Sequence, residues 1–209
     1  MEMVVYGGDV GDNTHASDGA AYNPLTDTWR LLAAPPIVER SGCGAVWTGR
    51  EMLVWGGVNG EQLLLDDGAS YDPADDLWRR LSPGPLDGRV SPVVVWTGDV
   101  MIVAAGVTNS DQFDVGAAAY RPNIDAWLDL DGPKQPARSS GVWTGRELVS
   151  VGQLVSFDLV QWSPLPEPPV KVGSGATATW TGTSLVVVGG GARRDSATDT
   201  AVVLVSGAE

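Results

Sequence analysis

Short apolar runs alternate with turn residues along the whole chain, and no window has the 3.6-residue spacing of an amphipathic helix. One unit shows the pattern clearly, with runs at residues 44–48, 52–55, 69–72 and 77–81. The first two runs flank Thr48-Gly49-Arg50-Glu51, a glycine-containing turn that predicts a β-hairpin. A turn at residues 73–76 contains proline and aspartate, which favour turns through a fixed φ and side-chain capping. The pattern therefore predicts a unit of four short antiparallel strands.

Four sequence marks recur in the same order along the chain. Trp-Thr-Gly occurs at residues 47–49, 96–98, 143–145 and 180–182. Glycine pairs or their variants end apolar runs at 7–8, 56–57, 105–106, 151–152 and 189–190. An aromatic residue and then a tryptophan follow, as Tyr22 and Trp29, Tyr71 and Trp78, Tyr120 and Trp127, and Phe157 and Trp162. The first three of these pairs lie 49 residues apart, whereas the fourth copy is shorter.

Four strands per unit at a period near fifty predict the blades of an all-β propeller, forming one domain over residues 1–209. The glycine pair, the tyrosine six or seven residues before a tryptophan, and the arginine ahead of the first strand resemble the kelch repeat. The resemblance covers essentially the whole chain and implies a kelch-type β-propeller of about five four-stranded blades. Proline-rich segments at 33–36, 82–85, 131–133 and 164–169 are interpreted as connections between blades.

The first and last units are predicted to be incomplete. Residues 2–8 align with 51–57, so the first blade lacks its innermost strand, and residues 201–205 are expected to be the third strand of the last blade. An unpaired strand edge invites pairing with another chain. Two alternatives stay open: the chain is a fragment of a longer protein, or the ring closes internally. In the second, the C-terminal strand becomes the first strand of blade one, because residues 203–207 resemble 45–49.

Composition narrows the function classes. The formal net charge is -13, with 13 basic and 26 acidic residues, which argues against nucleic-acid binding. No apolar run reaches the roughly 20 residues of a membrane helix. The single cysteine, Cys43, excludes an internal disulfide and is interpreted as a buried, inert thiol. Eight of the nine tryptophans belong to the repeat and are interpreted as packing between blades rather than as a ligand platform.

Candidate binding residues gather in the loops expected at one end of the propeller. A cation precedes the first strand of four blades, at Arg40, Arg89, Arg138 and Lys171. A ring of such groups would suit a carboxylate or an acidic peptide, because a guanidinium binds carboxylate bidentately. The alternative is that these cations pair with loop acids such as Glu39, Asp66 and Asp114. Polar residues after the glycine pairs, Asn59, Glu61, Asn109 and Asp111, are further candidates for ligand contact.

The loop after the first glycine pair carries Asp9, Asp12 and the only histidine, His15. Carboxylates and imidazole together suit a divalent metal, although a solvated acidic loop is the favoured interpretation and no cofactor is expected. No hydrolase, metalloprotease or nucleotide-binding motif is present. We therefore expect a binding or scaffold module that uses the loop face to recognise a protein or acidic ligand. The alternatives are a sugar mutarotase, as the kelch resemblance allows, and a structural fragment without a site. Many arginines beside two lysines suggest a bacterial source. The resemblance to bacterial kelch-like proteins, which are often exported, implies an extracytoplasmic location.

Overall fold

The computed structural model describes residues 2–109, 116–130, 132, 141–150, 155–166, 176–189 and 201–205. Within these residues there are antiparallel strands and no helix. It follows that no helix in this part of the chain could cross a membrane. The predicted all-β architecture is confirmed.

The described strands form five successive sheets, which we call sheets I to V. Sheet I contains β1 (Met3–Tyr6), β4 (Gly19–Asn23) and β5 (Thr28–Leu31). Sheet II contains β6 (Gly44–Trp47), β7 (Met52–Trp55), β8 (Gly68–Asp72) and β9 (Leu77–Arg80). Sheet III contains β10 (Val93–Trp96), β11 (Met101–Ala104), β12 (Ala117–Arg121) and β13 (Ala126–Leu130).

Two further sheets and one hairpin complete the described strands. Sheet IV contains β14 (Gly141–Trp143), β15 (Leu148–Ser150), β16 (Val155–Phe157) and β17 (Trp162–Pro164). Sheet V contains β18 (Thr177–Trp180), β19 (Ser184–Val188) and β20 (Ala201–Val205). The hairpin of β2 (Asp9–Gly11) and β3 (Thr14–His15) extends from sheet I.

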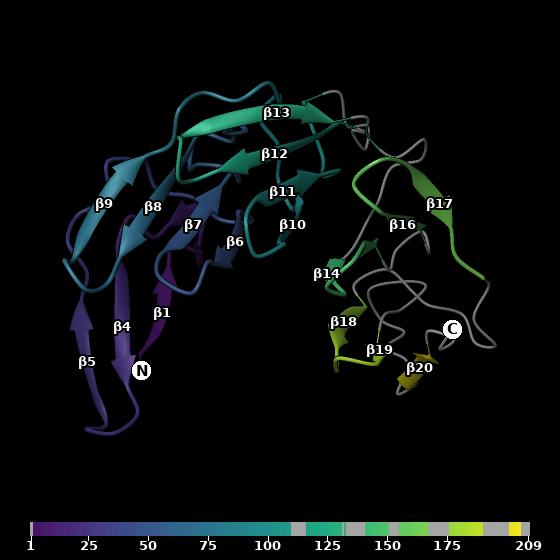
Figure 1. The fold of residues 1–209 in the computed structure, drawn as a ribbon. Helices are drawn as coiled ribbons and strands as arrows, with labels where there is room; N and C mark the ends of the chain where they lie inside the picture. The colour runs from purple at the N-terminus through teal and green to yellow at the C-terminus, as the bar shows by residue number, and fades with distance from the viewer. Residues whose placement is uncertain are drawn as a thin grey trace.

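The sheets follow one another along an arc, as the blades of a propeller do (Figure 1). Strands β6, β10, β14 and β18 lie on the inside of the arc, and β5, β9, β13 and β17 lie on its outside. Neighbouring inner strands lie side by side, β6 with β10, β10 with β14 and β14 with β18. Sheet I stands at one end of the arc and sheet V at the other.

The ends of the chain form the strands that the repeat predicts. Sheet I contains three described strands in the order β1-β4-β5, with β1 at its inner edge. The predicted third strand at 201–205 is β20, which pairs with β19 through partners such as Val186 and Val203. In this structure β20 belongs to sheet V and is not part of sheet I, so internal closure by this strand is not formed.

The Trp-Thr-Gly turn owes its shape to the threonine and the glycine. Gly49 has a φ of 98°, which favours glycine. The Thr48 hydroxyl accepts a hydrogen bond from the Glu51 amide at 2.9 Å and lies 3.1 Å from the Glu51 carbonyl. The same threonine contacts recur in the other three turns of this type. Side chain and backbone together therefore close each hairpin.

The core consists of apolar layers between successive sheets rather than one central cluster. Met52, Val54 and Tyr71 of sheet II pack with Ala21 and Leu32 from the preceding blade. Their counterparts 49 residues later, Met101, Val103 and Tyr120, pack with Leu81 and Trp55 of sheet II. Cys43 lies partly buried against the first layer, and burial raises the pKa of its thiol, as expected of an inert cysteine. The same layer is thus repeated from blade to blade.

Three polar side chains join each of these layers to the blade before it. Asp76 accepts hydrogen bonds from the Tyr71 hydroxyl at 2.6 Å and from the Ala33 amide at 3.1 Å. The Trp78 indole donates to the carbonyl of the same Ala33 at 2.9 Å. One backbone residue is therefore held through both its N–H and its C=O groups. We call this arrangement the Tyr–Asp–Trp clamp.

The clamp recurs one repeat later. Asp125 accepts from the Tyr120 hydroxyl at 2.6 Å and from the Ser82 amide at 3.0 Å, and the Trp127 indole donates to the Ser82 carbonyl at 2.8 Å. The prediction that the last-strand tryptophans pack between blades is confirmed for Trp78 and Trp127. The first-strand tryptophans were predicted to pack between blades as well, but Trp47 of β6 is 49% exposed.

The clamp predicts a loss of stability in acid. The tyrosine and amide donors lower the pKa of Asp76 and of Asp125 in the folded protein. A carboxyl group with a depressed folded pKa stabilises the protein above its unfolded pKa of about 3.9. We therefore expect the melting temperature to fall as the pH drops from about 4 through the folded pKa values.

An Asp125→Asn variant separates this effect from general acid unfolding. Asparagine tolerates the φ of 48° at this position but is an uncharged acceptor. At pH 7 the variant is expected to lose about 1 kcal/mol of unfolding free energy in urea titrations, and the difference should shrink as the pH falls below about 4. Asp75→Asn, at an exposed position in the neighbouring turn, is the matched control. A difference between Asp125→Asn and wild type that is independent of pH would contradict the assignment.

Candidate functional site

Arg40, the first of the predicted ring of cations, is fully buried, with an exposed fraction of 0%. Its guanidinium group donates to the carbonyl oxygens of Val38, Gly56 and Asp67 at 3.1, 3.0 and 3.2 Å. It also forms an ion pair with the Asp67 carboxylate at 2.8 Å. The side chain therefore joins the start of blade two to the loop between β7 and β8.

Arg89 repeats this arrangement one blade later and is 1% exposed. It donates to the carbonyl oxygens of Asp87, Ala105 and Gly116 at 3.0, 3.0 and 3.3 Å. Its guanidinium carbon also lies 6.0 Å from the centre of the Trp55 ring, within reach of a cation–π interaction. Arg138 and Lys171 lie outside the described residues. In both described positions the cation faces the protein interior, so the geometry favours the structural interpretation, with Asp67 as the acidic partner of Arg40.

The loops predicted to carry ligand contacts do meet at one end of the arc. The glycine pairs bend the chain there, and the Gly8 and Gly57 amides donate to the carbonyls of Arg40 and Arg89 at 2.9 and 2.8 Å. Asn59 is buried, and its side-chain oxygen accepts from the amides of Glu61 and Leu63 at 3.1 and 2.9 Å. Glu61 and Asn109 are exposed, and Asp111 lies outside the described residues. Asn59 thus shapes its loop, while Glu61 and Asn109 face solvent.

A pocket of about 350 Å³ lies between these loops, which we call the loop-face pocket. Its lining comes from the β2–β3 hairpin, the segment before Arg40 and the loop after the second glycine pair, as Asn13, Thr14, His15, Ser17, Glu39 and Gly60. A Cβ atom at Gly60 would lie 3.3 Å from the Asn13 carbonyl oxygen, so this glycine allows the two loops to approach closely. Three separate loops therefore build one polar hollow.

His15 is the unusual residue of the loop-face pocket. It is only 9% exposed, yet neither ring nitrogen has a hydrogen-bond partner among the described residues. Burying a polar group without a partner is costly, and such groups are rare in folded proteins. Glu39 supplies the one carboxylate of the pocket lining, whereas sugar chemistry of the glycosidase kind uses two. The pocket thus offers an unused imidazole beside a single negative charge.

The predicted metal set does not come together. Asp9 and Asp12 are exposed, and the Asp9 carboxylate accepts a hydrogen bond from the Gly11 amide at 2.8 Å within its own turn. Among the described residues no group of three or more histidine, cysteine, aspartate or glutamate side chains could hold a metal ion. In this structure Asp9, Asp12 and His15 do not converge on one point, because His15 is buried and the two carboxylates are exposed.

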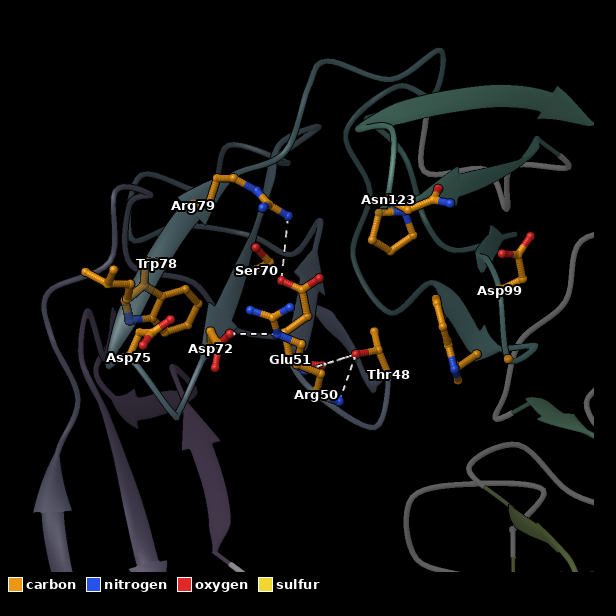
Figure 2. Close-up of a pocket in the computed structure, with 14 residues that line it drawn as sticks. Thr48, Arg50, Glu51, Ser70, Asp72, Asp75, Trp78, Arg79, Asp99 and Asn123 are labelled. Atoms are coloured by element: carbon orange, nitrogen blue, oxygen red, sulfur yellow. Dashed lines mark hydrogen bonds and ion pairs between the residues drawn. The ribbon is translucent and has the colours of Figure 1, made fainter.

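A larger pocket, of about 660 Å³, lies near the opposite, hairpin end of sheets II and III (Figure 2). Ion pairs cross it, Arg50 with Asp72 at 3.0 Å and Arg79 with Glu51 at 3.6 Å. The Ala74 amide and then Arg50 lower the pKa of Asp72. The sequence did not predict this pocket, because Arg50 and Arg79 do not stand at the repeated position of Arg40 and Arg89 ahead of the first strand. Its two guanidinium groups in the lining already have carboxylate partners, unlike the imidazole of the loop-face pocket.

The burial of Arg40 makes a prediction that distinguishes a structural arginine from a ligand-binding one. Arg40→Ala is expected to lower the free energy of unfolding by about 3–5 kcal/mol, because it leaves Asp67 and buried carbonyl groups without their donor. Urea unfolding of the purified variant measures this loss. Arg50→Ala is the matched control, since Arg50 is 80% exposed in its ion pair and should contribute less than about 1 kcal/mol. Equal stability of the two variants would contradict the structural role.

Comparisons with known proteins agree with the repeat and the sheet arrangement. Residues 39–85, which span sheet II and its flanking segments, match the model of the Kelch motif. No curated protein matches the chain. The solved structure of YjhT superposes with a TM-score of 0.79 at 15% sequence identity, over 98% of this chain and 78% of that one. At this identity the likeness describes the fold.

The fold and the motif lead to the same architecture. Four-stranded antiparallel sheets follow one another along an arc, one of them carries the family motif, and nearly the whole chain superposes on YjhT. The chain therefore has the fold of a kelch-type β-propeller, and its residues 39–85 match the Kelch motif.

Proposed function

We propose that this protein is a non-enzymatic binding module that recognises a partner through the loop face, with the loop-face pocket taking a basic side chain of that partner. A kelch-type propeller supports a binding or scaffold role in general. The observation that carries the finer proposal is His15, buried at 9% exposure with both ring nitrogens unpartnered in the described part of the chain. A ligand that supplies a hydrogen-bond donor would satisfy the acceptor nitrogen of this ring.

The charge of the pocket and of the chain favours a cation over an anion. Glu39 is the charged carboxylate of the pocket lining, and the whole chain carries a formal charge of -13. The arginines that would have attracted an acidic ligand, Arg40 and Arg89, are directed into the protein. An acidic surface also speeds the encounter with a basic partner by long-range attraction. The proposal therefore replaces the acidic ligand expected from the sequence with a basic one.

The donor set fits an ammonium group such as that of a lysine side chain. An ammonium has three donors and no acceptor, and it is matched by acceptors on the Glu39 carboxylate, the His15 ring, the Asn13 amide oxygen and the hydroxyls of Thr14 and Ser17. The carboxylate would contribute a charge-assisted hydrogen bond, and the walls of the pocket would reduce screening by solvent.

The single histidine makes the proposal directly testable. Nα-acetyl-lysine amide is titrated into the full chain, and the ring signals of His15 are followed by NMR. We expect saturable shifts of these signals with the lysine derivative and none with Nα-acetyl-norleucine amide, which has a similar length but lacks the ammonium. Glu39→Gln should weaken the apparent affinity by about tenfold, because it removes the charge from the hydrogen bond.

Glu61→Gln is the matched control, since Glu61 lies in an adjacent loop and is exposed. It should leave the affinity for the lysine derivative unchanged apart from a small general charge effect. Equal shifts with the lysine and norleucine derivatives, or equal affinity in Glu39→Gln and wild type, would refute the proposed recognition of a basic side chain.

A further inference from the structure

The pocket at the hairpin end of sheets II and III, which we call the hairpin-end pocket, has two walls of different chemistry. Sheet II and its turns supply a polar wall, formed by Arg50, Glu51, Ser70, Asp72 and Arg79. Sheet III and its turns supply Trp96, Asp99 and Asn123. In Figure 2 the labelled side chains of sheet II stand on one side of the pocket, and Asp99 and Asn123 stand on the other. The hairpin-end pocket therefore lies between two blades.

Strand register places the polar groups of sheet II together. Ser70 and Asp72 are two residues apart in β8, so their side chains point to the same face of the sheet. Arg79 of β9 is the register partner of Ser70. Ser70 is only 2% exposed, whereas the side chains of Arg50 and Arg79 are 80% and 56% exposed in their ion pairs. The polar wall thus runs from a buried serine to guanidinium groups that face solvent.

The repeat does not require polar residues on this wall. One repeat later, the positions of Ser70 and Arg79 are taken by Ala119 and Leu128. Sheet III nevertheless forms the same four-stranded sheet as sheet II. The polar wall is therefore a feature of the hairpin-end pocket and not a condition of the blade fold.

The opposite wall presents an indole. Trp96 of β10 is half-buried, packs against the apolar cluster between sheets II and III, and also lines the hairpin-end pocket. The residue at the same repeat position in sheet II, Trp47, lines a different pocket between sheets I and II. An aromatic ring at the edge of a pocket gives a flat apolar surface against which C–H groups of a ligand can be buried.

The charged groups of the lining favour a neutral ligand rich in hydroxyl groups. The described lining contains the carboxylates of Glu51, Asp72, Asp75 and Asp99 and the guanidinium groups of Arg50 and Arg79. The excess of carboxylates disfavours an anion. A carboxylate has about four lone-pair sites and a guanidinium has about five N–H donors, so an ion pair leaves acceptors and donors free side by side. A hydroxyl group, which both donates and accepts, matches such a pair.

We propose that the hairpin-end pocket binds a neutral sugar built of glucose-type pyranose rings, with the C–H face of one ring on Trp96 and its hydroxyl groups on the polar wall of sheet II. Equatorial hydroxyl groups leave C–H bonds on both faces of such a ring, which is therefore flat and apolar on its faces and polar at its edge. The volume of about 660 Å³ lies in the range of small-molecule sites, which is roughly 300–1,000 Å³. The loop-face pocket lies at the opposite end of the sheets, so either site can be absent without the other.

The probe is cellobiose, which consists of two linked glucose rings. It is titrated into the full chain while the indole N–H signal of Trp96 is followed by NMR. We expect a saturable shift of this signal with cellobiose. D-glucitol should cause none, because it has the hydroxyl groups of glucose but no ring to lie on the indole.

Variants of the chain identify the contacts, with the affinity for cellobiose measured by calorimetry. Trp96→Leu keeps an apolar side chain against the cluster but removes the flat ring, and Asp72→Asn removes the charge of an acceptor. Each should weaken the affinity by about tenfold. Trp47→Leu is the matched control, since it changes the same residue type at the same repeat position outside the hairpin-end pocket, and it should leave the affinity unchanged.

The absence of a saturable shift up to the solubility limit of cellobiose, or an equal response to D-glucitol, would overturn the assignment of a sugar. An affinity equal to that of wild type in Asp72→Asn and in Trp96→Leu would do the same. An equal loss in Trp47→Leu and Trp96→Leu would show that the sugar contacts exposed indoles in general, which also contradicts a site at the hairpin-end pocket.

Discussion

The Tyr–Asp–Trp clamp is the contact on which the arrangement of the blades depends. Each clamp holds one backbone residue of the preceding blade through both its hydrogen-bonding groups, as Asp76 and Trp78 hold Ala33. Apolar layers alone would allow neighbouring sheets to slide, because apolar burial has no direction. Two hydrogen bonds to a single residue fix the register of one blade on the next. The apolar layer contributes most of the stabilisation, and the clamp determines the geometry.

The buried arginines have a comparable role at the loop end. Arg40 holds carbonyl groups on both sides of the β7–β8 loop and pairs with Asp67, and Arg89 does the same for the next blade through Ala105 and Gly116. Each cation therefore satisfies carbonyl groups where loops meet the sheets. Loops anchored in this way can vary in sequence without loss of the fold, which is the usual relation between a propeller and its binding surface.

The loop-face pocket differs from the layers between blades in its physical character. It is a small polar hollow in which a buried imidazole lacks a partner in the described part of the chain, beside the carboxylate of Glu39. A hollow of this size suits the tip of one side chain rather than an extended segment.

The sequence by itself determined the architecture, because the strand pattern and the 49-residue interval are local properties that each repeat carries independently. It also determined the strand at 201–205, which is the third strand of sheet V. It could not determine the direction of a long side chain. Arg40 stands at the right place for a ligand-binding ring, yet it turns inward, because the carbonyls of Gly56 and Asp67 from distant segments surround it.

Only the tertiary structure decided which groups are buried and which are left without a partner. Asp9, Asp12 and His15 are near in sequence, but a tight hairpin directs the carboxylates to solvent and the imidazole inward. Glu39, the carboxylate that lines the loop-face pocket together with His15, is 24 residues away and belongs to the next blade. Likewise, Met3 and Met52 are the same residue in the same repeat position. Whether each is exposed depends on a neighbouring sheet, which the local sequence does not encode.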